Sequence, residues 1–398
     1  MLRLLRLTTA GESHGPALVC TLEGMPAGVP LVAADINAEL FRRQQGYGRG
    51  RRMQIERDEV ELLSGVRAGE TMGSPVAMLI RNRDWKNWME IMDPAPREDD
   101  AEGLRPRSVT RPRPGHADLT GVLKYDRVDA RDILERASAR ETTARVAGAA
   151  VARALLSQFD ITIGSHLVHL GGLDAALVPL PDDLNAASDR SSLRTLDPAA
   201  EARMISRIDA AKDSGDTLGG ICEIVARGLP VGLGSHVSWD RKLDGRVGQA
   251  MLSIPAVKGV EIGLGFDAAR QSGAHVHDEI VIASGVSRTG NVHRTTNRAG
   301  GLDGGMTNGE PVVVRVAMKP ISTLMQPLKT IDTTTSEPAS ASVERSDVTA
   351  VPAMGVIAEA MLALVLADAM IEKFGGDSLT EMRRNHDAYL AHLAQRLG

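Results

Sequence analysis

Cysteines and aromatic residues are scarce in this chain, and neither sign of charge dominates. Cys20 and Cys222 are the only cysteines in 398 residues, which excludes a disulfide framework and a zinc site of paired cysteines and fits a reducing compartment. The net charge of −5 provides no global basic field for nucleic acid. Aromatic residues make up only 3% whereas glycine occurs 40 times, a balance that predicts many tight turns and close backbone approaches.

The chain also lacks a long apolar run without charges. Residues 1–7 carry an arginine at every third position, so they do not resemble a signal peptide. The most apolar stretch, 354–371, contains Glu359 and Asp368, which favours a buried helix over a membrane span. We therefore expect a cytoplasmic protein with no membrane partner.

A length of 398 residues with 43% hydrophobic side chains is sufficient for a large core. Helical and strand-like patterns interleave without a regular βαβ rhythm, so the α+β class is predicted. No break in composition marks a linker, and we expect a single domain over residues 1–398. Helical patterns cover 33–44, 139–159, 197–212, 242–253, 352–374 and, from a capping box at 378–381, the C-terminal segment 376–398; strand patterns cover 53–64, 75–81, 161–170, 220–226, 279–284 and 311–318.

Two segments have the composition of irregular structure. Residues 92–115 are rich in Pro, Asp and Arg, and we expect them to form an active-site loop. Residues 171–200 are rich in Pro, Asp and Ser, which predicts a surface insertion.

Residues 11–15 read Gly-Glu-Ser-His-Gly, and His14 is the first candidate catalytic residue. The two glycines let the backbone fold back closely, which can aim the imidazole as a proton donor at a bound anion. The same letters match the nucleophile elbow of hydrolases, with Ser13 as the nucleophile. That elbow requires a helix after the serine, whereas Pro16 and a strand-like alternation at 17–22 follow it here. The sequence after Ser13 therefore does not support the hydrolase interpretation.

The segment 41–57 holds six arginines in seventeen positions, with Gly46, Gly48 and Gly50 alternating through it. The glycines let the backbone turn while the guanidinium groups converge, which suits a ligand with several carboxylates or a phosphate. A solvated basic loop or an RNA-contacting patch is the alternative. RNA binding also favours stacking aromatics, and this segment has only Tyr47 besides Phe41 at its first position.

Two further segments place ionisable groups at a bend and at a helix start. His116 follows Gly115 and lies near Asp118, a candidate orienting acid, although such a pair in a loop is commonly only a surface feature. Ser138 is a candidate helix N-cap with Glu141 as its capping-box partner. The free N–H groups of that first turn favour an anion, while a well-capped helix without a ligand is the alternative.

Three segments in the C-terminal half also carry candidate ligand contacts. Asp347 precedes the long apolar helix, where a carboxylate is either a cap or a general base. Residues 319–323 and the glycines of 300–306 offer hydroxyls and small residues for holding a flat or phosphorylated ligand. Neither segment matches a P-loop or a Rossmann fingerprint, so those nucleotide sites are not indicated.

Taken together and in this order, the segments resemble the chorismate synthase family from residue 5 to 375. Three long stretches carry the resemblance: GESHGPALVCTLEGMP at 11–26, ERASARETTARVAGAAV at 135–151 and RSDVTAVPAMGVIAEAM at 345–361. The shorter stretches RRQQGYGRGRRM, RPRPGHAD, NRAGGLDGGMTNG and MKPIST agree as well. Several long motifs in the right order are more specific than any one alone, which favours function over the structural alternatives.

The resemblance implies a lyase of the shikimate pathway. Such an enzyme converts 5-enolpyruvylshikimate 3-phosphate to chorismate by 1,4-anti elimination of phosphate and a ring proton, with reduced FMN required but not consumed. By resemblance, His14 is the acid at the leaving phosphate, His116 protonates or stabilises the flavin, and Asp347 works with flavin N5 to remove the ring proton. The implied substrate contacts are Ser13, Arg43, Arg49, Arg52, Arg113 and Arg140.

The resemblance also implies a fold, an assembly and a flavin site. The fold is a β-α-β sandwich with helices packed between antiparallel sheets, assembled as a homotetramer. We see no reductase-like extension and expect a monofunctional, bacterial-type enzyme with an external source of reduced flavin. Pro255 stands where relatives often carry Asn or Gln, and proline offers neither a side-chain amide nor an N–H to a flavin. The implied FMN contacts are Arg136, Ala137, Ser138, Pro255, Ala256, Gly304, Lys319, Pro320, Ile321, Ser322, Thr323 and Arg345.

Two other functions compete with the lyase. A polyanion- or RNA-binding protein built on the arginine-rich segment predicts an affinity that falls steeply with salt, but it leaves His14, His116 and Asp347 without a role. A Ser-His hydrolase built on Ser13 predicts labelling by a serine-directed acylating reagent.

Overall fold

The computed structural model describes residues 2–50, 57–96, 107–287, 290–344 and 347–397, and two antiparallel sheets dominate it. The first sheet has the strand order β1-β2-β6-β3 and the second has the order β10-β15-β9-β7-β8. All neighbouring strands in both sheets pair antiparallel, so the predicted α+β class is confirmed. The strands are β1 (Arg6–Ala10), β2 (Ala17–Glu23), β3 (Val60–Ser64), β6 (Val76–Arg81), β7 (Thr162–Leu170), β8 (Leu173–Asp174), β9 (Gly220–Arg227), β10 (Val257–Ile262) and β15 (Val312–Met318).

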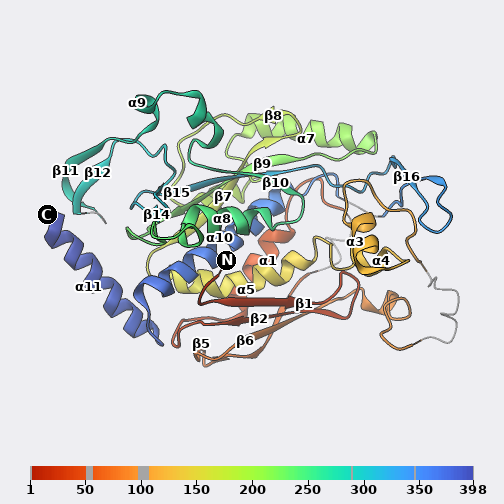
Figure 1. Ribbon diagram of the computed structural model, residues 1–398, viewed down its shortest axis with the longest axis horizontal. Helices are drawn as coiled ribbons and strands as arrows, with labels where there is room; N and C mark the ends of the chain where they lie inside the picture. The colour runs from red at the N-terminus through yellow and green to blue at the C-terminus, as the bar shows by residue number, and fades with distance from the viewer. Residues whose placement is uncertain (1, 51–56, 97–106, 288–289, 345–346, 398) are drawn as a thin grey trace.

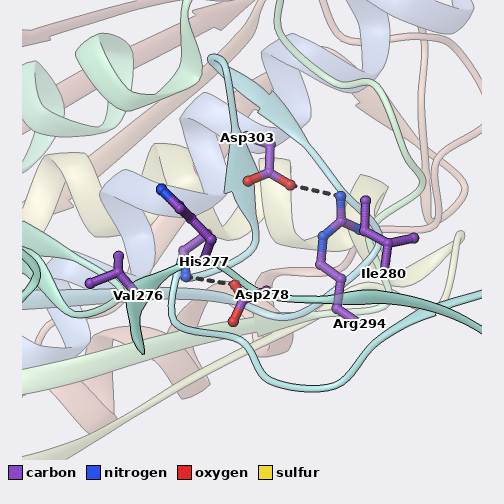
Figure 2. A pocket seen from close by; sticks show the side chains of 7 residues that line it. Val276, His277, Asp278, Ile280, Arg294 and Asp303 are labelled. Atoms are coloured by element: carbon purple, nitrogen blue, oxygen red, sulfur yellow. Dashed lines mark hydrogen bonds and ion pairs between the residues drawn. The ribbon is translucent and has the colours of Figure 1, made fainter. Parts of the chain in front are cut away.

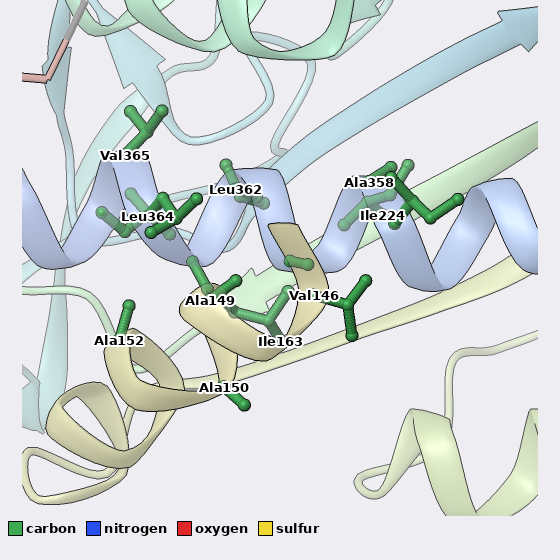
Figure 3. Packing of buried hydrophobic residues seen from close by; sticks show 14 of the residues in the cluster. Val146, Ala149, Ala150, Ala152, Ile163, Ile224, Ala358, Leu362, Leu364 and Val365 are labelled. Carbon is green, nitrogen blue, oxygen red and sulfur yellow. The ribbon is translucent and has the colours of Figure 1, made fainter. Parts of the chain in front are cut away.

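Three long helices pack against these sheets (Figure 1). Helix α5 (Glu141–Ser157) contacts β1 and β2 of the first sheet, and helix α10 (Val351–Phe374) contacts β7 and β9 of the second. The two helices pack on each other, and α1 (Ala33–Gln44) contacts both (Figure 3). The hydrophobic core therefore lies along the α5–α10 contact.

The sequence explains why these helices approach so closely. Helix α5 is rich in alanine and carries Gly148 against β1, where an added Cβ would lie 2.4 Å from Cδ1 of Leu7. Helix α10 is apolar on all sides, which is typical of a helix that is buried all round. It is long and apolar enough to cross a membrane, but 94% of its most apolar window is buried inside the protein.

Two of the three acidic residues of α10, Glu359 and Asp368, are buried and paired inside the core. The carboxylate of Glu359 is fully buried and lies 3.0 Å from guanidinium nitrogens of Arg42, Arg153 and Arg194. These cations hold the pKa of Glu359 well below its usual range, although burial alone would raise it. Asp368 accepts hydrogen bonds from Arg246 and from backbone N–H groups of residues 3–5. The ion pairs of Glu359 and the hydrogen bonds of Asp368 therefore connect α10 to neighbouring segments.

The segment 171–200 combines surface and interior positions. Residues 177–183 are exposed or half-buried, whereas Leu193 is fully buried and Arg194 reaches Glu359. Asp197 caps α7 (Pro198–Asp213) by accepting from the N–H groups of residues 199 and 200, as the Asp-Pro pair predicts.

Shorter elements complete the fold. The predicted strand 53–64 begins only at Val60 among the described residues, and the predicted helix 139–159 spans 141–157. The other elements are β4 (Val66–Arg67), β5 (Glu70–Thr71), α3 (Asp118–Tyr125), α4 (Arg131–Leu134), α6 (Leu184–Ser188), α8 (Leu243–Leu252), α9 (Gly273–Val276), β11 (Ile280–Ser287), β12 (Gly290–Arg294), β13 (Leu302–Asp303), β14 (Met306–Thr307), β16 (Lys329–Ile331), β17 (Pro338–Ser340), α11 (Leu379–Leu397) and the 3-10 turns Trp85–Asn87, Trp239–Arg241 and Gly265–Arg270.

Candidate active site

His14 lies in the turn between β1 and β2. Its Nδ1 is 2.9 Å from Oε1 of Glu135, and its backbone N–H donates to Oε2 of the same residue at 2.8 Å. Trp88 stacks on the imidazole with ring centroids 3.7 Å apart. Strand β2 begins three residues later, at Ala17, so no helix follows Ser13 and the hydrolase elbow is excluded.

Glu135 is a functional candidate to which the sequence analysis gave no role. It follows α4 and is almost fully buried, with Nη1 of Arg131 3.0 Å from Oε1. Burial alone would raise the pKa of Glu135, but the hydrogen bonds from His14 and the charge of Arg131 lower it below the ordinary value. Its 121-residue separation from His14 left no local spacing that could have indicated this contact.

His116 has an equivalent arrangement. Its Nδ1 is 2.5 Å from Oδ1 of Asp118, the fully buried first residue of α3. Arg113 donates from Nε to Oδ2 of Asp118 at 2.8 Å and from Nη1 to the hydroxyl of Thr323 at 2.9 Å. Although burial opposes it, these donors hold the pKa of Asp118 well below its usual range. Asp118 therefore orients His116, and Arg113 is mostly committed to Asp118.

Three of the predicted substrate arginines gather with Asp347. Arg49 Nε lies 3.2 Å from Oδ2 of Asp347, whose Oδ1 accepts from the backbone N–H of residue 50 at 2.6 Å. Arg43 and Arg140 both face Asp58, at 3.8 and 3.4 Å. Burial, together with repulsion from Arg49 and Arg140, lowers the pKa of Arg43 to about 10, against the opposing attraction of Asp58 and Asp347. Asp58 was absent from the sequence-based site.

Ser138 has a different role from the predicted one. The N-cap of α5 is Arg140, and its N–H donates to the Ser138 hydroxyl at 3.3 Å, so the predicted N-cap at Ser138 is wrong. The hydroxyl of Ser138 is also 3.1 Å from that of Ser13, and this contact directs it toward the loop of His14 rather than into the helix. Arg136, two residues before Ser138, donates to the carbonyls of residues 9 and 11 at the end of β1. Ala137 lies between Arg136 and Ser138 in the chain.

The predicted flavin contacts after β15 form a second group of donors. Lys319 Nζ and the Ser322 hydroxyl both donate to the carbonyl of Gly115, at 2.6 and 2.8 Å. Gly115 has φ +78°, and a Cβ there would lie 3.1 Å from Lys319 Nζ, so this contact requires glycine. Ala256 accepts from the Lys319 N–H at 2.9 Å and has φ +66°, an uncommon conformation for a residue with a side chain. Pro255 precedes Ala256 in the same turn, and Pro320 and Ile321 lie between Lys319 and Ser322.

This group fits an anionic cofactor such as flavin mononucleotide. The Nζ of Lys319 donates to neutral oxygens, and its pKa is lowered first by burial and then by the charge of Lys258. A phosphate close to Lys319 would compensate both effects. The neighbouring hydroxyl of Ser322 is a suitable second donor.

Gly304 is the described flavin contact that stands apart from this group in the chain. It is in the β13–β14 hairpin before β15, whereas Lys319 follows that strand, which is roughly 20 Å long. Arg52 and Arg345 lie outside the described residues, as do residues 97–106 of the predicted active-site loop.

Helices α3 and α4 join the two histidine clusters. They pack on each other, with Asp118 beginning α3 and Arg131 beginning α4. The segment 342–344, which precedes Asp347 in the chain, contacts the loop before α3 and the start of α4. The Ser342 N–H donates to the carbonyl of residue 111, and Glu344 pairs with Arg131 at 3.2 Å. Figure 1 shows α3, α4 and β16 together at one end of the molecule, remote from α11.

A cavity of about 250 Å³ lies away from this site, beside β11 and β12 (Figure 2). Three of its charged groups already have partners: Arg294 pairs with Asp303 at 2.7 Å, and Asp278 accepts from backbone N–H groups of residues 298 and 299. It contains none of the predicted site residues. We therefore assign the candidate active site to the α3–α4 end.

Comparisons with known proteins identify the family of the chain. A model of the family described as "Chorismate synthase" matches residues 5–371. The chain is 56% identical over 394 residues to "Chorismate synthase" of Geobacter metallireducens, covering 98% of this chain and 99% of that protein. The corresponding protein of Symbiobacterium thermophilum is 56% identical over 396 residues, covering 98% and 100%. A structure titled "Crystal Structure of Chorismate Synthase" superposes with a TM-score of 0.79 at 42% identity, covering 99% of this chain and 100% of that one. The chain belongs to the chorismate synthase family.

Proposed function

We propose that the α3–α4 end of this protein is where 5-enolpyruvylshikimate 3-phosphate is converted to chorismate. As a family member, the protein is a carbon–oxygen lyase acting on phosphates in the shikimate pathway. The observation that carries the proposal is the pair of oriented imidazoles, His14 on Glu135 and His116 on Asp118, held by two helices that pack together.

The arginine cluster supports binding of a multiply charged anion. Arg43, Arg49 and Arg140 are largely buried and converge near the carboxylates of Asp58 and Asp347. Among the described residues, the buried Nε of Arg49 lacks a well-aligned hydrogen-bond acceptor. The two carboxylates and the phosphate of the substrate are suitable partners for converging guanidinium groups.

His14 is assigned as the acid at the leaving phosphate. A fully anionic phosphate is a poor leaving group, so a positioned proton donor lowers the barrier. Ser13 and Ser138 place two hydroxyls beside the same loop, where they can orient the substrate. The Asp347 carboxylate, held by Arg49, is assigned to help remove the ring proton.

Lys319, Ser322 and the Pro255–Ala256 turn are assigned to hold reduced FMN, together with Arg136 and Ser138 beside the loop of His14. When bound, reduced FMN supplies electron density that assists cleavage of the carbon–oxygen bond. His116 is assigned as the proton donor or hydrogen-bond partner on the flavin side, since Asp118 fixes its ring.

The finer architectural expectations also belong to this proposal. The contacts of α5 with β1 and β2, and of α10 with β7 and β9, support a β-α-β sandwich. We expect a homotetramer in the cytoplasm that receives reduced flavin from an external source.

An anaerobic assay tests the function. Photoreduced FMN and the enolpyruvyl substrate are added to the protein, and diene absorbance and phosphate release are followed. We expect His14→Ala and Asp347→Ala to lower kcat by about 10²–10⁴-fold with flavin binding nearly intact, and Arg49→Ala chiefly to raise KM. His236→Ala, an exposed histidine, is the control. Turnover of His14→Ala at the wild-type rate would show that the assigned acid is wrong.

A further inference from the structure

Both carboxylate oxygens of Glu135 contact His14. Oε1 lies 2.9 Å and Oε2 3.1 Å from Nδ1, and Oε2 also accepts the backbone N–H of His14 at 2.8 Å. Only 3% of Glu135 is exposed, so water does not compete for these contacts. The carboxylate thus fixes the backbone and the ring of the same residue.

The chemistry of the pair selects one tautomer. An ionised carboxylate only accepts hydrogen bonds, and the lowered pKa of Glu135 keeps it ionised at neutral pH. Nδ1 of His14 therefore carries a hydrogen in both protonation states of the ring. Nε2, on the opposite edge of the imidazole, is then the nitrogen that exchanges a proton with a ligand.

Trp88 fixes the plane of the ring. Its indole stacks on the imidazole at 3.7 Å, and its Nε1–H donates to Asp84 at 3.0 Å. The charged groups around the pair are Arg131, 3.0 Å from Glu135 and 5.3 Å from the Trp88 ring, and Arg107, 5.1 Å from that ring. Glu344 pairs with the second nitrogen of Arg131 at 3.2 Å. Two arginines therefore lie near the pair, and among the described residues the Glu135 carboxylate is in direct contact with the imidazole.

We propose that Glu135 is the positioning residue of His14, holding Nδ1–H and stabilising the imidazolium so that Nε2 donates the proton to the leaving phosphate. The proposal rests on the function assigned above, because it takes His14 as the acid. In this step one proton leaves Nε2 of His14 and bonds to an oxygen of the leaving phosphate, while Glu135 remains a carboxylate throughout. The ring then regains a proton from solvent.

Glu135→Gln tests the proposal, because it removes the charge and keeps the shape. Loss of the carboxylate charge beside the ring makes the imidazolium less stable. We therefore expect the alkaline limb of the kcat profile to move to lower pH by about 1–3 pH units. At neutral pH we expect kcat to fall by about 10–10³-fold, with KM nearly unchanged. Glu135→Asp should restore part of kcat and the wild-type position of the limb. Glu12→Gln, an exposed carboxylate two residues before His14, is the matched control and should match the wild type.

A second measurement does not depend on turnover. Diethyl pyrocarbonate acylates neutral imidazole, and peptide mass analysis reports the acylation of His14 as a function of pH. We expect its midpoint to move to lower pH in Glu135→Gln but not in Glu12→Gln. A wild-type midpoint in Glu135→Gln would overturn the proposal. So would a loss of kcat with an unshifted pH profile, which indicates a merely structural role. If instead the midpoint moves while His14→Ala retains full turnover, the positioning contact stands and the assigned acid fails.

Discussion

Replacing Asp118 by Asn should destabilise the protein and disable His116 together. The carboxylate is fully buried and accepts four hydrogen bonds: from Nε, Nη2 and the backbone N–H of Arg113, at 2.8, 3.1 and 3.1 Å, and from His116 at 2.5 Å. Asn keeps one acceptor oxygen and turns an NH₂ group toward these donors. The buried guanidinium of Arg113 also loses its counter-charge.

Removing one partner of such a buried pair costs about 3–5 kcal/mol in the free energy of unfolding. Urea denaturation at fixed protein concentration measures this cost, with Asp126→Asn as the control because Asp126 is exposed at the end of the same helix. We expect Asp126→Asn to stay within about 0.5 kcal/mol of the wild type. The anaerobic assay should show a parallel loss of kcat, because His116 loses its orienting acceptor.

The pH dependence gives a second criterion. The pKa of Asp118 is lower in the folded protein than its ordinary value, so its contribution to stability is complete above the unfolded pKa of about 3.9. That contribution is lost as pH falls below this value toward the folded pKa. The stability difference between wild type and Asp118→Asn should therefore shrink as the pH falls below about 4 toward pH 3. A difference below about 1 kcal/mol at pH 7 would refute the reasoning.

Three further predictions concern the core. Glu359→Gln leaves one buried and two half-buried guanidinium groups without their shared carboxylate and should lower the free energy of unfolding by about 3–5 kcal/mol, measured by urea denaturation. Gly220→Ala places a Cβ 2.3 Å from the carbonyl oxygen of residue 169 and should lower the free energy of unfolding by about 1–3 kcal/mol. Gly248→Ala, in open space on α8, should raise it by about 0.5–1 kcal/mol. Equal effects of the two substitutions would contradict the packing. Burial raises the pKa of Cys20 and Cys222 to about 12, so a thiol-disulfide reagent at pH 8 should label neither before denaturation, and rapid labelling of the native protein would be inconsistent with the fold.

Local patterns in the sequence were sufficient for the elements and for the order of the motifs. The Asp197-Pro198 pair caps α7 as predicted, and the apolar run with Glu359 and Asp368 forms the buried helix α10. Such features depend on neighbours within one or two turns, so spacing alone reveals them. The motif order likewise identified the family before any contact was known.

Only the tertiary structure decided which groups meet. Glu135 reaches His14 across 121 residues, and Asp58 faces Arg140 across 82 positions of the chain (140 − 58). Nor did the sequence indicate that Ser138 turns toward Ser13 instead of capping α5. Such contacts depend on how helices and strands pack, because a charged side chain pairs with the partner that the fold brings within a few ångströms, wherever that partner lies in the chain.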